Sequence, residues 1–212
     1  MLKGLARWAP LTGVLYAVLF VVAFLAGGNT PDSDASAQHA VSSFVSNRND
    51  DRLTVFLIAY ASVFAVFFAA ALRSYLKARS EGDGLLTLGY SGMIIFVIGA
   101  LTLVGLEFAA ADVPGKISPS AEQALNVLQD DVFFALLVGA GIFLIGNGLA
   151  FVGSTAMPTW LGWISVLLAI LAVTPLGWIV AIFALPIWAL IVSVLMFIRQ
   201  GAPTAAQAGA TG

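Results

Sequence analysis

The sequence predicts an all-α polytopic membrane protein in which six transmembrane helices form one domain and two short amphipathic helices lie on its outer side. Three observations lead to this fold class. Of the 212 residues, 60% are hydrophobic and only 9% are charged, whereas soluble domains carry about 25% charged residues. Long apolar stretches recur along the chain, and the basic residues gather in alternate connecting segments. The lipid bilayer is therefore the expected partner of most of the surface.

Four apolar stretches are each long enough for one crossing. A helix rises about 1.5 Å per residue, so a hydrocarbon core of about 30 Å needs roughly 20 residues. The four predicted spans are 10–27, 53–76, 85–110 and 132–152. The first follows Lys3 and Arg7 and ends in small residues, which also suits a cleavable signal peptide. Because it is 18 residues long, we expect a membrane helix instead.

The fifth and sixth predicted spans share one apolar run, 160–198. Its 39 residues are about twice the length of one crossing, and Thr174-Pro175-Leu176-Gly177 provides a hairpin turn. The run therefore divides into spans 160–173 and 177–198, and residues 200–212 are expected to form a disordered tail. The 14 residues of the fifth span reach only about 21 Å, so its turn should lie below the outer surface and needs protein around it.

Two polar connections are predicted to form the short outer helices. The first has an apolar stripe with helical spacing over residues 37–45, and Asp32 or Ser33 is its expected N-cap. In the second, Ser118 is the N-cap and Pro119 the first helical residue. Its apolar stripe consists of Ala121, Ala124, Leu125 and Leu128. Such helices lie flat on lipid or cover the bundle. We favour the arrangement in which they cover the bundle, because neither helix has the basic polar face typical of helices bound to anionic membranes.

The distribution of Lys and Arg predicts the orientation in the membrane. One side of the predicted bundle holds Lys3, Arg7, Arg73, Lys77, Arg79 and Arg199, and the other holds Arg48, Arg52 and Lys116. Most acidic residues lie on the side with fewer basic residues. Because basic residues favour the cytoplasmic side, we expect both termini to be cytoplasmic, in a multi-pass protein of the cell membrane.

Composition also excludes several classes of function. The net charge of −2 leaves no basic surface for nucleic acid. The chain contains no cysteine, and His39 is its single histidine, so we expect no metal, haem or other cofactor. Phosphate-binding glycine loops and the serine-hydrolase and zinc-protease motifs are also missing from the sequence. We therefore assign no catalytic residue and do not expect an enzyme.

Acidic residues near the outer ends of the spans are candidate binding residues. Glu107 is the carboxylate closest to the hydrocarbon; it could exchange protons, or its side chain could extend to water or to nearby Arg and Lys residues. The second alternative is the simpler one. The pairs Asp50-Asp51 and Asp130-Asp131 could concentrate cations or hold a divalent ion. We favour helix capping, because each pair opens a predicted span.

Three further candidates lie inside the spans. Asn147 is surrounded by glycines, of which Gly139, Gly141, Gly146 and Gly148 are expected to share one helix face. It is predicted to hydrogen-bond a neighbouring helix, with binding of a substrate as the alternative. Pro186 leaves the carbonyl of Ile182 without its helical partner, as in a kink or a binding site. Trp188 is expected to pack against other helices.

The run Met157-Pro158-Thr159-Trp160-Leu161-Gly162-Trp163 resembles the Leu-Pro-x-Trp-Leu-Gly motif of a family of bacterial, often actinobacterial, six-helix membrane proteins of unknown function. The similar layout covers residues 8–199, and Met157 replaces the usual Leu. The resemblance implies a bacterial cytoplasmic-membrane protein and no particular activity. In physical terms the motif is a helix start with Pro and interfacial Trp residues.

Two functions fit these features. The first is a module without catalysis that binds a lipophilic ligand or another membrane protein. The alternative is a small oligomeric transporter or channel for a cation or proton, guided by Glu107 and the outer acidic residues. Polar residues that face one common cavity would favour transport, whereas a dry, lipid-like pocket would favour binding. The relevant polar residues are Ser62, Ser91, Thr102, Asn147 and Ser193.

Overall fold

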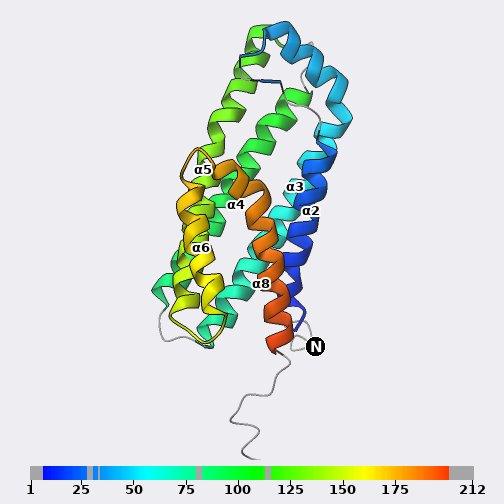
Figure 1. Ribbon diagram of the computed structural model, residues 1–212. Helices are drawn as coiled ribbons and strands as arrows, with labels where there is room; N and C mark the ends of the chain where they lie inside the picture. Colours follow the sequence, from blue (N-terminus) through cyan, green and yellow to red (C-terminus); the bar gives the residue numbers. More distant parts are fainter. Residues whose placement is uncertain (1–6, 28–30, 33, 80–82, 113–115, 201–212) are drawn as a thin grey trace, which may run out of the picture.

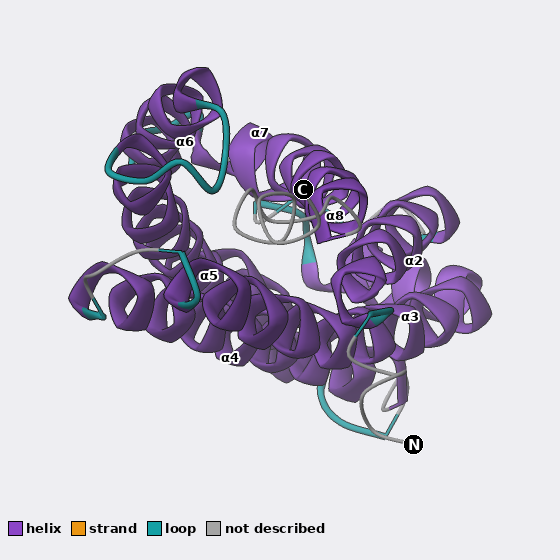
Figure 2. Ribbon diagram, turned by 90° about the horizontal axis from the view of Figure 1, so that it is seen from below, coloured by secondary structure: helices purple, strands orange, loops and turns teal. Residues whose placement is uncertain are grey.

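The computed structural model describes residues 7–27, 31–32, 34–79, 83–112 and 116–200, and these form a bundle of helices (Figures 1 and 2). The long helices are α2 (Thr12–Ala26), α3 (Ala37–Lys77), α4 (Gly84–Asp112), α5 (Pro119–Val152), α6 (Thr159–Ala172) and α8 (Leu185–Gln200). A 3-10 turn, η1 (Ala9–Leu11), precedes α2; α7 (Gly177–Ile179) and the π-helical η2 (Val180–Ala184) precede α8. The predicted tail beyond Gln200 lies outside the described residues.

The described chain has the helix lengths of a multi-pass membrane protein. Five segments are long and apolar enough to cross a bilayer: Ala9–Ala26, α3, α4, α5 and Gly177–Gln200. The apolar α6 is shorter, with 14 residues, as the sequence predicts. The predicted hairpin is confirmed, because α6 ends at Ala172 and a turn separates it from α7.

The two predicted outer helices are not separate elements. They are the first turns of α3 and α5, which have 41 and 34 residues. The sequence between each polar segment and its span contains neither Gly nor Pro, so nothing interrupts the helix. Ser36 is the N-cap of α3, in place of the expected Asp32 or Ser33, whereas the predicted cap Ser118 is confirmed for α5. We call these turns, residues 37–52 and 119–131, the α3 and α5 extensions.

Two predictions about these segments are wrong. The pairs Asp50-Asp51 and Asp130-Asp131 do not cap helices, because they lie well inside α3 and α5. The extensions also do not cover the α6–α7 turn: they continue past it along the bundle (Figure 1), and Val173 and Leu176 in the turn remain 64% and 53% exposed. Both extensions lie at the far end of the long helices, where that of α3 is bent relative to the rest of the helix, and this end is beyond the level of the α6–α7 turn (Figure 1).

Glycines bring α4, α5 and α6 close together. A Cβ atom on Gly99 of α4 would lie 2.6 Å from the backbone nitrogen of Leu136, and one on Gly146 of α5 would lie 2.5 Å from that of Gly89. On a different side of α5, a Cβ on Gly148 would lie 2.8 Å from Ser165 Cβ in α6. The α5 glycines therefore form two faces and not the single face expected: Gly139 and Gly146 contact α4, whereas Gly141 and Gly148 contact α6.

The described chain begins and ends at the same end of the bundle. The ring of Trp8 packs on that of Phe197, with centroids 5.7 Å apart. At this end Tyr75 Oη and Arg199 Nη1 both donate to the carbonyl oxygen of Ala156, over 3.3 and 2.8 Å. We call this the Ala156 end. The opposite end, where α4 finishes and both extensions lie (Figure 1), is the Asp112 end.

Candidate ligand cavity

A cavity of about 510 Å³ lies between α2, α3, α4, α5 and η2. Most of its wall is apolar. The apolar lining consists of Phe20, Ala23, Phe24, Gly27, Ile58, Ala100, Leu103, Val104, Phe133, Leu136 and Ile182. The other lining residues are Thr54, Glu107 and Gln129. The wall thus combines a large hydrophobic surface with a few polar groups, as ligand sites in proteins usually do.

The polar residues lie together at one end of this cavity. Helix α4 runs toward the Asp112 end, so Glu107 lies about 10 Å beyond Ala100 along the axis. Helices α3 and α5 run the opposite way, which places Thr54 and Gln129 at the same level, nearer the Asp112 end than the apolar residues that follow them. The cavity is therefore amphipathic along the bundle axis.

The three polar side chains are almost fully buried. Glu107 is 8% exposed, and Thr54 and Gln129 are each 6% exposed. Thr54 Oγ1 donates a hydrogen bond of 3.3 Å to the carbonyl oxygen of Ala23, in the last turn of α2. Gln129 Oε1 has no hydrogen-bond partner among the described residues. Asp51, also buried, acts electrostatically on Glu107.

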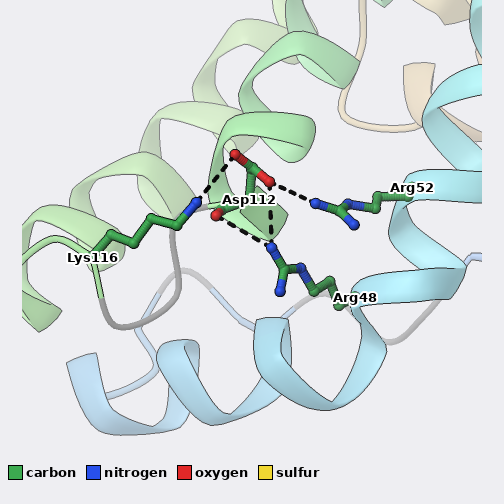
Figure 3. Close-up of polar contacts among 4 residues, drawn as sticks. All are labelled: Arg48, Arg52, Asp112 and Lys116. Atoms are coloured by element: carbon green, nitrogen blue, oxygen red, sulfur yellow. Dashed lines mark hydrogen bonds and ion pairs between the residues drawn. The ribbon is translucent and has the colours of Figure 1, made fainter.

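The basic residues near Glu107 are engaged by another carboxylate (Figure 3). Asp112 Oδ1 lies 2.6 Å from Arg52 Nη2 and 3.3 Å from Arg48 Nη2, and Asp112 Oδ2 lies 3.5 Å from Lys116 Nζ. In the described structure Glu107 forms no ion pair with any of the three, so its expected extension to them is not found. The reason is position, because Asp112 ends α4 and lies beside both arginines of α3.

The α5 extension turns a polar face toward the bundle. Glu122, Asn126 and Gln129 follow at helical spacing and are at most 6% exposed, whereas Leu128 of the predicted apolar stripe is 47% exposed. The prediction that this stripe is buried is therefore wrong. Asn126 Nδ2 donates to the carbonyls of residues 31 and 32, over 3.2 Å each, so the polar face holds the segment that follows α2. Both carboxyl oxygens of Glu122 lack a hydrogen-bond partner among the described residues.

The other candidate binding residues lie outside the cavity. Asn147 is 3% exposed, and its Nδ2 donates to the carbonyl of Phe143 in its own helix. Pro186 is buried in the first turn of α8, two residues after η2 ends. The π-helical turn of η2 includes Ile182, the residue that loses its helical partner. Asp131 is exposed in a shallow groove on the α5 extension. Asp130 lies in α5, and its side chain is outside the described part of the structure.

Trp188 packs inside the bundle, as expected. Its ring stacks on Phe151 with centroids 5.8 Å apart and an interplanar angle of 6°, and meets Phe143 and Phe68 edge-on at 5.3 and 6.3 Å. Its Nε1 donates a 2.7 Å hydrogen bond to Ser165 Oγ, which in turn donates to the carbonyl of Leu161. This aromatic cluster joins α3, α5, α6 and α8.

The polar residues that would indicate a transport path do not come together. Ser91 and Thr102 are exposed on α4. Asn147, Ser62 and Ser193 are buried, and none of the five lines the cavity. Among the residues that the structure describes, no group of three or more His, Cys, Asp or Glu is placed to hold a metal ion.

Sequence reasoning identified Glu107 but missed Thr54 and Gln129. A signal for Gln129 is present in the sequence, because residues 122, 126, 129, 133 and 136 follow one face of a helix.

No family model, curated protein or solved structure matches this chain.

Proposed function

We propose that this membrane protein binds a lipophilic ligand with a polar head group in the cavity between α2, α3, α4, α5 and η2. The observation that carries the proposal is the distribution of polarity in the cavity wall, with Glu107, Gln129 and Thr54 at one end and apolar side chains along the rest. The volume of about 510 Å³ lies within the usual range of roughly 300–1,000 Å³ for ligand pockets.

Binding is better supported than transport. A transport path needs polar groups that follow one another across the membrane. From Glu107 toward the Ala156 end, the cavity wall is apolar as far as Ala100 and Leu136. The polar residues that could mark a transport path lie outside the cavity. An amphiphile would place its chain against this apolar wall and its head group beside Glu107.

We further propose six crossings with both termini in the cytoplasm of a bacterium. Helix α6 then counts as a crossing despite its length. The common location of the chain's two described ends supports an even number of crossings. The basic residues Arg73, Lys77, Arg79 and Arg199 belong to the Ala156 end, which supports its cytoplasmic location.

Dodecanol is a suitable reference ligand for a test by native mass spectrometry and by equilibrium binding in lipid nanodiscs. Ala100→Phe fills the cavity from a position that is 2% exposed, and Leu101→Phe adds the same side chain at the next residue, which is 43% exposed. We expect saturable binding to the wild type and to Leu101→Phe, and loss of binding in Ala100→Phe.

Folding of each variant is checked by gel filtration and thermal unfolding, since a phenyl ring in a packed wall can itself destabilise the bundle. Leu103→Trp fills the same cavity from a half-buried position and provides a second test. Saturable dodecanol binding that persists in both folded cavity variants would contradict the proposed site.

A further inference from the structure

We propose that the cavity selects an amphiphile with a cationic, amine-type head group. This inference rests on the proposed function and deepens it. It follows from the charge and hydrogen-bonding capacity at the polar end. There a carboxyl group and an amide oxygen without a partner in the described structure lie in the wall of a cavity that no described basic residue lines.

The first argument is charge. The fourteen lining residues include Glu107 and no Lys, Arg or His. The three basic residues of the Asp112 end, Arg48, Arg52 and Lys116, have their terminal nitrogens on Asp112. A carboxylate or phosphate head group would therefore lie beside the carboxyl group of Glu107, on which Asp51 also acts electrostatically. No cationic side chain of the described structure lines the wall to offset the repulsion. An ammonium group would have a direct counter-ion in Glu107.

The second argument is hydrogen bonding. Gln129 Oε1 is buried without a partner in the described structure, and an acceptor in that state costs about 1–3 kcal/mol. Thr54 uses its hydroxyl hydrogen on Ala23, so its oxygen can only accept from a ligand. An alkylammonium group carries three donors and no acceptor, as the Lys side chain does, and it could serve Glu107, Gln129 and Thr54 together. A hydroxyl group carries one donor.

The third argument is the field of the α5 extension. Glu122 is fully buried, and it lies about 10 Å from Gln129 along the same helix face. Its carboxyl oxygens have no hydrogen-bond partner in the described chain. Burial raises the pKa of the Glu122 carboxyl, so a nearby positive charge is what would favour its ionised form. The ionised form in turn acts over a longer range at low local dielectric than it would in water.

Three probes with the same chain test this selection: dodecylamine, dodecanol and dodecanoate. Their binding is measured in nanodiscs of zwitterionic lipid at pH 7, with empty nanodiscs as the reference for partition into lipid. We expect dodecylamine to bind about tenfold more tightly than dodecanol, because hydrogen bonds to a charged group are roughly twice as strong as neutral ones. Dodecanoate should bind most weakly.

Variants assign the preference to the cavity. Glu107→Gln keeps the shape of the side chain and should reduce the affinity for dodecylamine to that for dodecanol, with dodecanol binding unchanged. Asp34→Asn removes an exposed carboxylate of the segment that leads into α3, outside the cavity wall, and should leave the preference intact. Gln129→Leu should weaken dodecylamine binding and leave dodecanoate unaffected.

The possible outcomes separate the two proposals. If dodecanol binds saturably and dodecylamine binds no more tightly, the cavity binds lipophilic ligands but the head-group selection is refuted. A preference for dodecylamine that survives in folded Glu107→Gln also refutes it. If none of the three probes binds saturably, the proposed function itself fails.

Discussion

The contact between α4 and α5 is the feature of this fold that a single methyl group tests best. A Cβ atom on Gly99 would lie 2.6 Å from the backbone nitrogen and 3.0 Å from the Cα atom of Leu136, whereas ordinary contact begins at 3.4 Å. In Gly99→Ala the two backbones must therefore move apart by about 0.8 Å, the difference between 3.4 and 2.6 Å. Neither partner atom belongs to a flexible side chain that could move away.

The change in the free energy of unfolding of Gly99→Ala is the sum of two opposing effects. Overpacking a tight interface costs about 1–3 kcal/mol, and replacing Gly by Ala within a helix returns about 1 kcal/mol. A Cβ on Gly105, also in α4, would meet nothing within 4 Å, so Gly105→Ala should show only the favourable effect. We expect Gly99→Ala to lower the free energy of unfolding by up to about 2 kcal/mol and Gly105→Ala to raise it by about 0.5–1 kcal/mol.

Thermal unfolding in detergent micelles measures both variants. For a chain of this size, 1 kcal/mol corresponds to about 2–4 °C in Tm, so the two variants should differ by several degrees in opposite directions. A Gly99→Ala protein at least as stable as Gly105→Ala would show that α4 and α5 do not approach as closely as described.

Three further predictions concern other parts of the bundle. Ser165→Ala should lower stability by about 1–2 kcal/mol, because it leaves the buried Trp188 Nε1 without an acceptor. In a Trp188→Phe background the same change should cost less. Equal costs in the two backgrounds of this double-mutant cycle would contradict the coupling between Ser165 and Trp188. Asp112→Asn should lower stability only slightly, since the ion pairs of Asp112 are partly exposed, and high salt should reduce the loss. An undiminished loss at high salt would argue against a screened surface network. Because the chain has no cysteine, Ser120→Cys and Thr155→Cys can be labelled singly in intact cells with a membrane-impermeant maleimide, and only Ser120→Cys should react; reaction of Thr155→Cys would reverse the proposed orientation.

The spans could be predicted because their signal is local. A run of about 20 apolar residues has few stable alternatives to a membrane helix, and Thr174-Pro175 marks the turn between α6 and α7 within the sequence itself. The extensions could not be separated from their spans by the same reasoning. Polar composition predicts where a helix leaves the hydrocarbon, but only a breaker such as Gly or Pro ends it, and residues 46–53 contain neither.

The orientation of the α5 extension was predicted wrongly for a related reason. In a soluble protein an apolar stripe predicts the buried face, but a helix beside the bilayer has two environments that accept apolar groups. Leu128 and Val127 are 47% and 38% exposed, while Glu122 and Asn126 are buried, and Asn126 donates to the segment that follows α2. Hydrogen bonding of that segment's carbonyl groups decides the orientation, and the sequence does not show it. Glu107 could be identified from the sequence as a candidate binding residue, because ionisable residues so close to the hydrocarbon are rare and are usually functional.

The cavity exists because neighbouring helices end at different levels. Helix α2 stops at Ala26, where Gly27 N and Thr54 Oγ1 both donate to the carbonyl oxygen of Ala23, while α3, α4 and α5 continue toward the Asp112 end (Figure 1). The last turn of α2 therefore forms one wall of a space whose far end lies between the longer helices, beside Glu107. A ligand in this space would contact the exposed, lipid-side ring of Phe24 at one end and buried carboxyl and amide groups at the other. This difference in helix length thus accounts for both the lateral location of the cavity and its polarity, and extending α2 by one apolar turn should close it.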